Sequence, residues 1–327
     1  MSNSWKDFGS HCYDNLQVPT SLWLARGMLS MNEVKMLYSA SAHFFKGAGS
    51  IVDAGAFAGM SAYSLASGLR ANSSGNYQKS VKKPIISSYD LFETDGDYTK
   101  DYLANVFYTS RGANGDIKNI DYVPSINEDF LSVFWFQNAM FRDLIKVYKG
   151  DFSQASWKNG AIEILFVDVC KTLELNQHVV REFLPNMIEK ESVLIQQDFH
   201  HIWHPYIHLT MEILKPYFEI VINGESASRV YRLIKAPPKK ILEEASILDL
   251  DEKQILEMYR GVYSTVNENQ ARLLRVSCVK ALADAKYKDA ATAMADDLLK
   301  DSAFYENAWL SGELKRLLKN SQITIKK

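Results

Sequence analysis

Hydrophobic positions in the first two thirds of the chain follow two alternating patterns. Short continuous apolar runs are typical of buried strands, whereas apolar residues three and four positions apart are typical of helices. Most of the runs end at or just before an aspartate: Asp90, Asp151, Asp168 or Asp198. This alternation predicts a parallel sheet covered by helices on both faces. The predicted strands are 50–54, 84–89, 144–148, 162–167 and 192–196, and the predicted helices are about 31–45, 60–70 and 173–190.

The rest of the chain is predicted to close the sheet and then to continue as helices. Two strand-like segments, 217–223 and 229–234, follow a predicted helix at about 205–215 and indicate a closing antiparallel pair. Pro237-Pro238 interrupts the pattern, and the segment after it has the spacing of amphipathic helices. We therefore expect a helical lead at 1–46, an α/β domain at 47–236 with an insertion or lid at 91–143, and a helical appendage at 237–327.

Composition narrows the classes of partner. The 327 residues include 37 Lys and Arg against 39 Asp and Glu, and no basic block could follow a phosphate backbone, so we expect no nucleic-acid partner. Cys12, Cys170 and Cys278 lack the spacing of a disulfide framework or a thiolate zinc site. The sequence shows neither a signal-peptide core nor an apolar run long enough to span a bilayer. We expect a cytoplasmic protein without a membrane partner.

The predicted strand at 50–54 leads into a glycine-rich turn, Asp53-Ala54-Gly55-Ala56-Phe57-Ala58-Gly59. Its pattern is acidic-x-Gly-x-x-x-Gly, which differs from the G-x-G-x-x-G of dinucleotide folds. Glycines let a ligand lie against the backbone, and the next helix offers free N–H groups to a carboxylate. Asp53 could hold an amine. The turn therefore suits a small ligand that carries both an amine and a carboxylate.

From Val52 to Ser61 the chain resembles the first motif of the class I S-adenosylmethionine-dependent methyltransferases, and the resemblance extends over about residues 45–235. It implies a Rossmann-like, mostly parallel sheet of seven strands with a closing antiparallel pair, and S-adenosylmethionine as cofactor. The turn would hold the methionine part, Asp90 the ribose hydroxyls, and Gly150-Asp151-Phe152 would flank the adenine. The cofactor-binding residues that the resemblance implies are Asp53, Gly55, Phe57, Gly59, Ser61, Asp90, Asp151, Phe152 and Asp168.

Asp168 and the pair Gln197-Asp198 resemble the metal-binding positions of the small-molecule O-methyltransferases of the catechol and macrocin types. Mg²⁺ or another divalent cation prefers oxygen ligands and would lower the pKa of a bound hydroxyl. Lys171 matches the position of a lysine base in the catechol type, where a depressed pKa would suit that role. Gln197 supplies only a neutral carbonyl. The alternative is that Asp168 only positions the cofactor and Asp198 only caps a turn.

Histidines gather directly after the predicted strand at 192–196. Pro205 favours a helix that begins near His204, which leaves His200 and His201 in a loop at the end of the sheet. Either could act as a general base without a metal, or could simply bond to the backbone. We expect His208, on the helix, to be structural. The 91–143 insertion is predicted to contain a helix from Asn127, which carries several aromatic residues. These aromatic residues could wall an acceptor pocket, although packing is the simpler explanation.

These patterns predict methyl transfer from S-adenosylmethionine to a hydroxyl of a small molecule such as a sugar, a phenol or a natural product. A non-catalytic binding or assembly module on the same fold is the alternative, with the appendage mediating a homodimer. A nicotinamide-dependent oxidoreductase is disfavoured by the glycine spacing of the turn.

Overall fold

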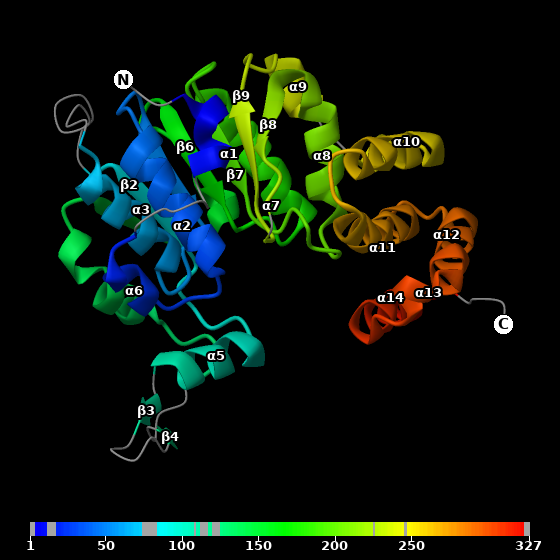
Figure 1. Ribbon diagram of the computed structural model, residues 1–327, viewed down its shortest axis with the longest axis horizontal. Coiled ribbons are helices and arrows are strands. Elements are labelled where there is room, and N and C mark those ends of the chain that lie inside the picture. The colour runs from blue at the N-terminus through cyan, green and yellow to red at the C-terminus, as the bar shows by residue number, and fades with distance from the viewer. Residues whose placement is uncertain are drawn as a thin grey trace. The chain divides into compact units, whose positions relative to one another are not determined.

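The computed structural model describes residues 4–11, 18–73, 84–107, 109–111, 117–119, 125–224, 226–244 and 247–323 (Figure 1). The chain divides into two compact units, Met1–Val167 and Asp168–Lys327. Of the three cysteines, Cys170 and Cys278 are free and buried, and Cys12 lies outside the described residues.

The main sheet has seven strands in the order β5-β2-β1-β6-β7-β9-β8. β1 pairs in parallel with β2 and β6, β2 pairs in parallel with β5, and β9 pairs antiparallel with both β7 and β8. The predicted α/β, Rossmann-like sheet with its closing antiparallel pair is therefore confirmed. The strands are β1 (Ser50–Ala54), β2 (Ile86–Asp90), β5 (Ile145–Lys149), β6 (Ile162–Val167), β7 (Val193–Gln196), β8 (Phe218–Ile222) and β9 (Arg229–Leu233).

In the first unit, two helices that flank β1 in the sequence pack against each other. α2 (Met31–Ser39) begins with a capping box between Ser30 and Glu33 and continues as a π-helical turn, Ala40–Phe44. It packs against α3 (Met60–Ala71), where a Cβ on Gly68 would overlap the Ser41 hydroxyl. Glycine is therefore required for this close approach of the two backbones. The short helix α1 (Phe8–His11) precedes them.

The insertion contains elements that the hydrophobic pattern did not indicate. α5 (Asp97–Phe107) leads into a small antiparallel ladder of β3 (Thr109–Arg111) and β4 (Ile117–Asn119). The helix predicted to start at Asn127 instead begins later, as α6 (Leu131–Asn138). Asn127 has a φ of +63°, which lies outside the right-handed helical region and delays the start.

The second unit contains the other edge of the sheet and the helix α8 (Pro205–Leu214), whose first residue is the proline expected there. α7 (Leu173–His178) is shorter than the helix predicted at 173–190, because its continuation changes to π-helical and 3₁₀ turns that end at Asn186. β7, β9 and β8 form an antiparallel arrangement in which every residue of β7 is buried.

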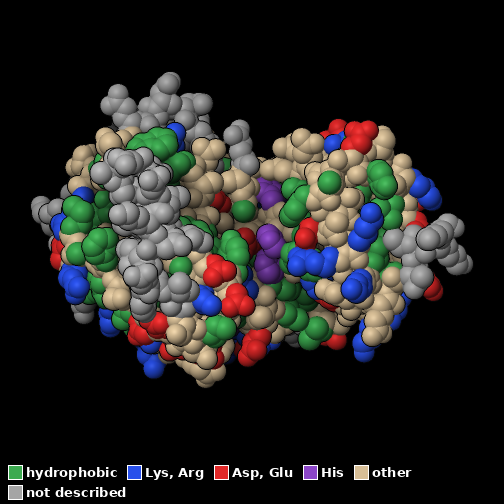
Figure 2. Space-filling model, turned by 90° about the horizontal axis from the view of Figure 1, so that it is seen from below, with side chains coloured by type: hydrophobic (Ala, Val, Ile, Leu, Met, Phe, Trp, Pro, Cys, Tyr) green, Lys and Arg blue, Asp and Glu red, His purple; other side chains and the backbone are tan. Residues whose placement is uncertain are grey.

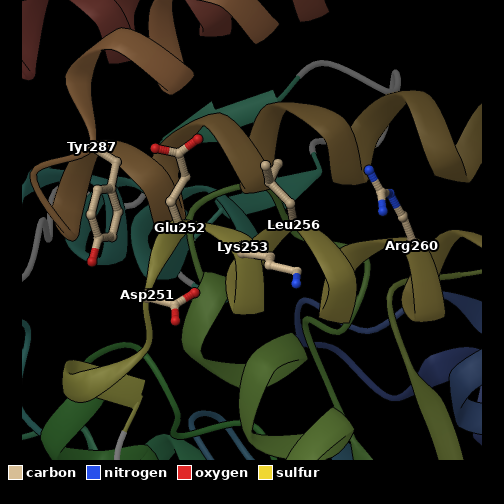
Figure 3. A pocket seen from close by; sticks show the side chains of 6 residues that line it. All are labelled: Asp251, Glu252, Lys253, Leu256, Arg260 and Tyr287. Atoms are coloured by element: carbon tan, nitrogen blue, oxygen red, sulfur yellow. The ribbon is translucent and has the colours of Figure 1, made fainter.

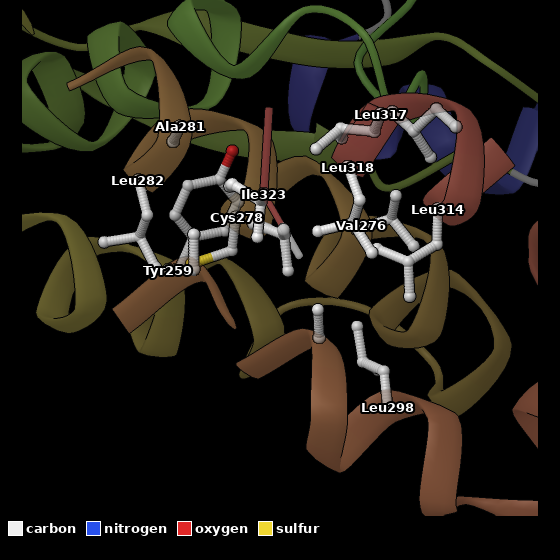
Figure 4. Packing of buried hydrophobic residues seen from close by; sticks show 14 of the residues in the cluster. Tyr259, Val276, Cys278, Ala281, Leu282, Leu298, Leu314, Leu317, Leu318 and Ile323 are labelled. Atoms are coloured by element: carbon white, nitrogen blue, oxygen red, sulfur yellow. The ribbon is translucent and has the colours of Figure 1, made fainter. Parts of the chain in front are cut away.

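The segment predicted as a helical appendage, 237–327, contains six helices within its described residues, and two of them, α10 and α11, pack against α8 (Figure 1). Its core contains Tyr259, Val276 and Leu314 (Figure 4). The same core includes Ile202, in the loop after β7, and Leu209, on α8. Within the part of the chain that the structure describes, no helix is long and apolar enough to cross a membrane. The helices are α9 (Lys239–Glu244), α10 (Glu252–Tyr263), α11 (Glu268–Asp284), α12 (Lys288–Lys300), α13 (Ser302–Tyr305) and α14 (Ala308–Asn320).

Candidate functional site

The turn between β1 and α3 has an unusual backbone. Gly55 and Gly59 have φ values of +92° and +93°, and Phe57 has a φ of +45°, which is uncommon for a residue with a side chain. The Phe57 ring packs against Tyr102 and Phe130, with centroid distances of 5.7 and 5.3 Å. The amides of Gly55 and Ala56 donate to the carbonyl of Tyr89, the residue before Asp90. The turn is thus held against the end of β2.

Asp90 fixes the middle of this turn. The Phe57 amide donates to Asp90 Oδ2 and the Phe92 amide donates to Asp90 Oδ1, both at 2.8 Å. Burial raises the pKa of Asp90, and these two backbone donors oppose that shift. The carboxylate and the glycine-rich turn, which the sequence predicted to act on one ligand, are therefore in direct contact.

The residues that follow β5 lie next to Asp90. The Gly150 amide donates to the Asp90 carbonyl at 3.0 Å, and Gly150, with a φ of +135°, has open space where a Cβ would lie. Asp151 is exposed and caps a 3₁₀ turn by accepting from the Ser153 amide at 2.9 Å. Phe152 is buried with its edge on the Tyr89 ring, at 5.5 Å. The residues predicted to flank adenine thus lie beside Asp90.

Asp53 and Ser61 are both buried, and the Ser61 side chain forms a hydrogen bond with Asp53. Ser88 Oγ donates to Asp53 Oδ2 at 2.9 Å, whereas Oδ1 has no hydrogen-bond partner among the described residues. Burial raises the pKa of Asp53 to about 6, although hydrogen bonds from Ser61 and Ser88 oppose it. An orphaned carboxylate oxygen needs a donor, and the amine of an amino-acid ligand is a suitable one. These residues fit S-adenosylmethionine.

Gly59 also has a structural role that the sequence did not indicate. A Cβ on Gly59 would overlap Asn138 Nδ2 and would lie 2.7 Å from Phe134 Cδ2, both on α6. Asn138 donates to the Gly59 carbonyl at 3.1 Å, and Gln137 donates to the Ala58 carbonyl at 3.2 Å. Asn and Gln near the end of a helix have no distinctive spacing, so no pattern could have identified these contacts. The insertion helix is therefore bonded to the glycine-rich turn.

In the second unit, Lys171 joins two of the predicted site carboxylates. Its Nζ donates to Asp168 Oδ1 at 2.7 Å and forms a short ion pair with Asp198 Oδ2. Burial lowers the pKa of Lys171, but the two carboxylates outweigh it and raise the pKa above its usual value. The depressed pKa expected for a lysine base is thus wrong. Asp198, which has a φ of +60°, has a pKa that burial would raise but that Lys171 holds below its usual range.

The third predicted metal ligand is bonded elsewhere. Gln197 is buried, and its Oε1 accepts a short hydrogen bond from the Ser228 hydroxyl. In the described ranges no group of three or more His, Cys, Asp and Glu side chains could hold a metal ion. The ammonium of Lys171 lies between the two carboxylates that a cation would need. As arranged, these residues do not fit a divalent metal.

His200 is almost fully buried and carries a free ring nitrogen. Its Nδ1 lies 2.7 Å from the Ser226 carbonyl, which assigns the proton to Nδ1, and Nε2 has no partner among the described residues. Burial lowers the pKa of His200 to about 4, and the nearby Arg229 adds to this shift. The Arg229 guanidinium is itself stacked on Phe199 at 3.8 Å. At neutral pH His200 is therefore uncharged, and the lone pair of its Nε2 has no partner within the described residues.

His201 and His204 are stacked on each other at 4.8 Å. The Trp203 amide donates to His201 Nδ1 at 3.3 Å, which assigns the His201 proton to Nε2. His204 Nε2 lies 3.9 Å from Asp198 Oδ2, and its Nδ1 lies 2.7 Å from the Tyr206 hydroxyl. Histidine side chains reach the surface on the face shown in Figure 2. His204 and Tyr206 were not among the predicted site residues. The sequence signal that could have indicated them was their closeness to Asp198 along the chain.

His208 is structural, as predicted, and links α8 to the appendage. Its Nδ1 lies 3.1 Å from the Tyr259 hydroxyl and 3.2 Å from Ser277 Oγ, and its Nε2 forms a short hydrogen bond to the Phe199 carbonyl. Burial lowers the pKa of His208 to about 3. The folded state therefore holds this imidazole uncharged.

This shift predicts a specific sensitivity to acid. Between about pH 6.5 and pH 3 the unfolded chain binds a proton at His208 that the folded chain does not. The free energy of unfolding should therefore decrease by about 1.4 kcal/mol for each unit by which the pH is lowered through this range. Above that range the contribution is complete. His208→Gln should lack this slope, so that urea denaturation shows its stability gap to the wild type narrowing as the pH falls. His43→Gln, at an exposed position, is the control. Parallel curves for His208→Gln and wild type would contradict the assignment.

A pocket of about 520 Å³ lies on the helical appendage (Figure 3). None of the predicted site residues lines it. Its lining residues are Asp251, Glu252, Lys253, Leu256, Arg260 and Tyr287.

No family model and no curated protein match the chain. Among solved structures, the O-methyltransferase NovP is similar over 64% of this chain and 82% of its own, at 13% identity and a TM-score of 0.45. CalS11, a TDP-rhamnose 3'-O-methyltransferase of calicheamicin biosynthesis, is similar over 70% and 92%, at 14% identity and a TM-score of 0.41. The S-adenosylhomocysteine-bound Podospora anserina methyltransferase PaMTH1 is similar over 68% and 92%, at 10% identity and a TM-score of 0.40.

The sheet itself identifies the fold. Its seven strands are mostly parallel and close with the antiparallel β8 and β9. A glycine-rich turn follows β1, and the carboxylate at the end of β2 bonds to it. The chain has the class I methyltransferase fold.

Proposed function

We propose that the chain binds S-adenosylmethionine and transfers its methyl group to a hydroxyl of a small molecule. The observation that carries the proposal is the hydrogen bond from the Phe57 amide to Asp90 Oδ2, which joins the glycine-rich turn to the carboxylate at the end of β2. The orphaned Asp53 Oδ1 and the open space at Gly150 support a ligand that extends along these residues.

Each residue has a defined part in this proposal. Asp53 binds the amine of the amino-acid portion, the amides at the start of α3 face its carboxylate, and Asp90 accepts from the ribose hydroxyls. S-adenosylmethionine supplies a methyl carbon on a sulfonium, a good leaving group that departs as a neutral thioether. As the acceptor oxygen forms its bond to that carbon, the hydroxyl proton passes to a base. His200 Nε2, with its lone pair free, is the base that we assign.

Binding of the nucleoside tests the first half of the proposal. Titration calorimetry of the full chain with S-adenosylhomocysteine should give a dissociation constant in the micromolar range, about −8 kcal/mol of binding free energy. NAD should give no heat, because the turn lacks the dinucleotide glycine spacing. Binding of NAD alone would revive the oxidoreductase, and the absence of heat from every nucleoside would favour a non-catalytic module.

Substitution of the histidines tests the base. With an acceptor found by screening hydroxylated small molecules for S-adenosylhomocysteine release, His200→Gln should lower kcat by about 100-fold, since a positioned base typically contributes at least that much. His201→Gln is the matched comparison, because the Trp203 amide occupies its Nδ1. A larger loss in His201→Gln than in His200→Gln would reverse the assignment, and equal activity of both variants with wild type would remove histidine from the reaction.

A further inference from the structure

Lys171, Asp168 and Asp198 form an ion cluster in which two carboxylates share one positive charge, the ammonium of Lys171. The Lys171 ammonium donates to Asp168 Oδ1 at 2.7 Å and to Asp198 Oδ2 at a shorter distance. The two carboxylates are only 22% and 16% exposed, so water screens the attraction less than at an open surface. The ammonium thus bridges the two carboxylates as a metal ion would.

Two features of the cluster oppose a second cation. A divalent ion close enough to bind both carboxylates would lie within a few ångströms of the ammonium, and like charges at that distance repel strongly. The remaining oxygen that the sequence offered, Gln197 Oε1, accepts from the Ser228 hydroxyl instead. The ring of His204, 3.9 Å from Asp198, offers a nitrogen, whereas Mg²⁺ prefers oxygen.

We propose that Lys171 is a built-in cation that replaces the divalent metal at Asp168 and Asp198, and that removal of its ammonium turns the two carboxylates into a divalent-cation site. With Lys171 in place, the three side chains carry a net charge of −1; without it, the two carboxylates carry −2. Affinity for hard divalent cations rises with the number of carboxylate charges at the site. The proposal does not depend on methyl transfer, because it concerns only these three side chains.

The experiment is a titration of the full chain with Mn²⁺, followed by the loss of the free-ion signal in electron paramagnetic resonance. Wild type should show no stoichiometric binding, and Lys171→Ala should bind one equivalent at least about tenfold more tightly than any wild-type binding, with Mg²⁺ competing. Lys171→Met keeps much of the aliphatic stem and should behave in the same way. Lys171→Ala combined with Asp198→Asn should lose the gained binding.

Lys280→Ala is the matched control, since Lys280 pairs with Asp284 at 2.6 Å on the surface of α11 and has one carboxylate partner there. It should gain no Mn²⁺ binding. One equivalent of Mn²⁺ bound equally well by wild type and by both Lys171 variants would overturn the proposal. So would failure of both variants to bind, if their urea denaturation shows that they are folded. Binding of S-adenosylhomocysteine, measured separately, keeps this outcome distinct from that of the proposed function.

Discussion

Asp90→Ala is expected to weaken S-adenosylhomocysteine binding about 1000-fold, a loss of about 4 kcal/mol. The carboxylate is expected to accept from two ribose hydroxyls, and hydrogen bonds to a charged group contribute about 1.5–3 kcal/mol each. The same carboxylate also holds the amides of Phe57 and Phe92, so its removal frees the backbone that faces the ligand. Titration calorimetry measures the change directly.

Two further variants separate the effect of the negative charge of Asp90 from its hydrogen bonds to the backbone. Asp90→Asn keeps an oxygen for the Phe57 amide and should bind more weakly than wild type but more tightly than Asp90→Ala. Asp101→Ala, at an exposed position on α5, should bind as wild type does. If Asp90→Ala is folded and binds the nucleoside within about threefold of wild type, a change of less than about 0.7 kcal/mol, the assignment of the cofactor site is wrong.

Gly59→Ala is expected to destabilise the protein by about 4 kcal/mol. A side chain at a φ of +93° is strained by about 1–3 kcal/mol, and the new methyl group must displace Asn138 and Phe134 of α6, which costs a similar amount. Urea denaturation should show the loss as a lower midpoint. Because α6 would move away from the turn, cofactor affinity should fall as well.

Two other glycines serve as controls that separate the backbone strain of Gly59→Ala from its steric overlap with α6. Gly160 has a φ of +83° but nothing within 4 Å of the position of a Cβ, so Gly160→Ala adds strain without a clash. Gly96 has open space and no positive φ, so Gly96→Ala adds neither. We expect losses in the order Gly59→Ala, Gly160→Ala, Gly96→Ala. Equal losses at Gly59 and Gly160 would show that contact with α6 does not contribute.

The sequence predicted the main sheet well because its strands are short apolar runs bounded by glycine and aspartate. β1 and β6 were located within these patterns, and the turn after β1 was recognisable from Asp53, Gly55 and Gly59 alone. The contact between that turn and Asp90 follows from topology, since adjacent parallel strands end at the same edge of a sheet. The pattern was therefore sufficient to place Asp90 against the glycine-rich turn.

Side-chain pairing was much less predictable. Lys171 was expected to have a depressed pKa, but the carboxylates of Asp168 and Asp198 together raise that pKa. Asp198 lies far along the chain, and the loop conformation that brings it to Lys171 is not encoded in any periodicity. The start of α6 was misplaced because Asn127 adopts a positive φ, which the sequence permits but does not require. The bonds from Asn138 and Gln137 to the turn depend on how the insertion folds back within its unit.

The hydrogen bonds of His208 have a genetic consequence. They connect the Phe199 carbonyl, one residue after Asp198, with Tyr259 on α10 and Ser277 on α11. A nonsense mutation that ends translation before α11 would leave His208 without Ser277 and would expose Ile202 and Leu209 to solvent. Alleles truncated in this way should therefore be null, even though every residue assigned to the chemistry would still be encoded.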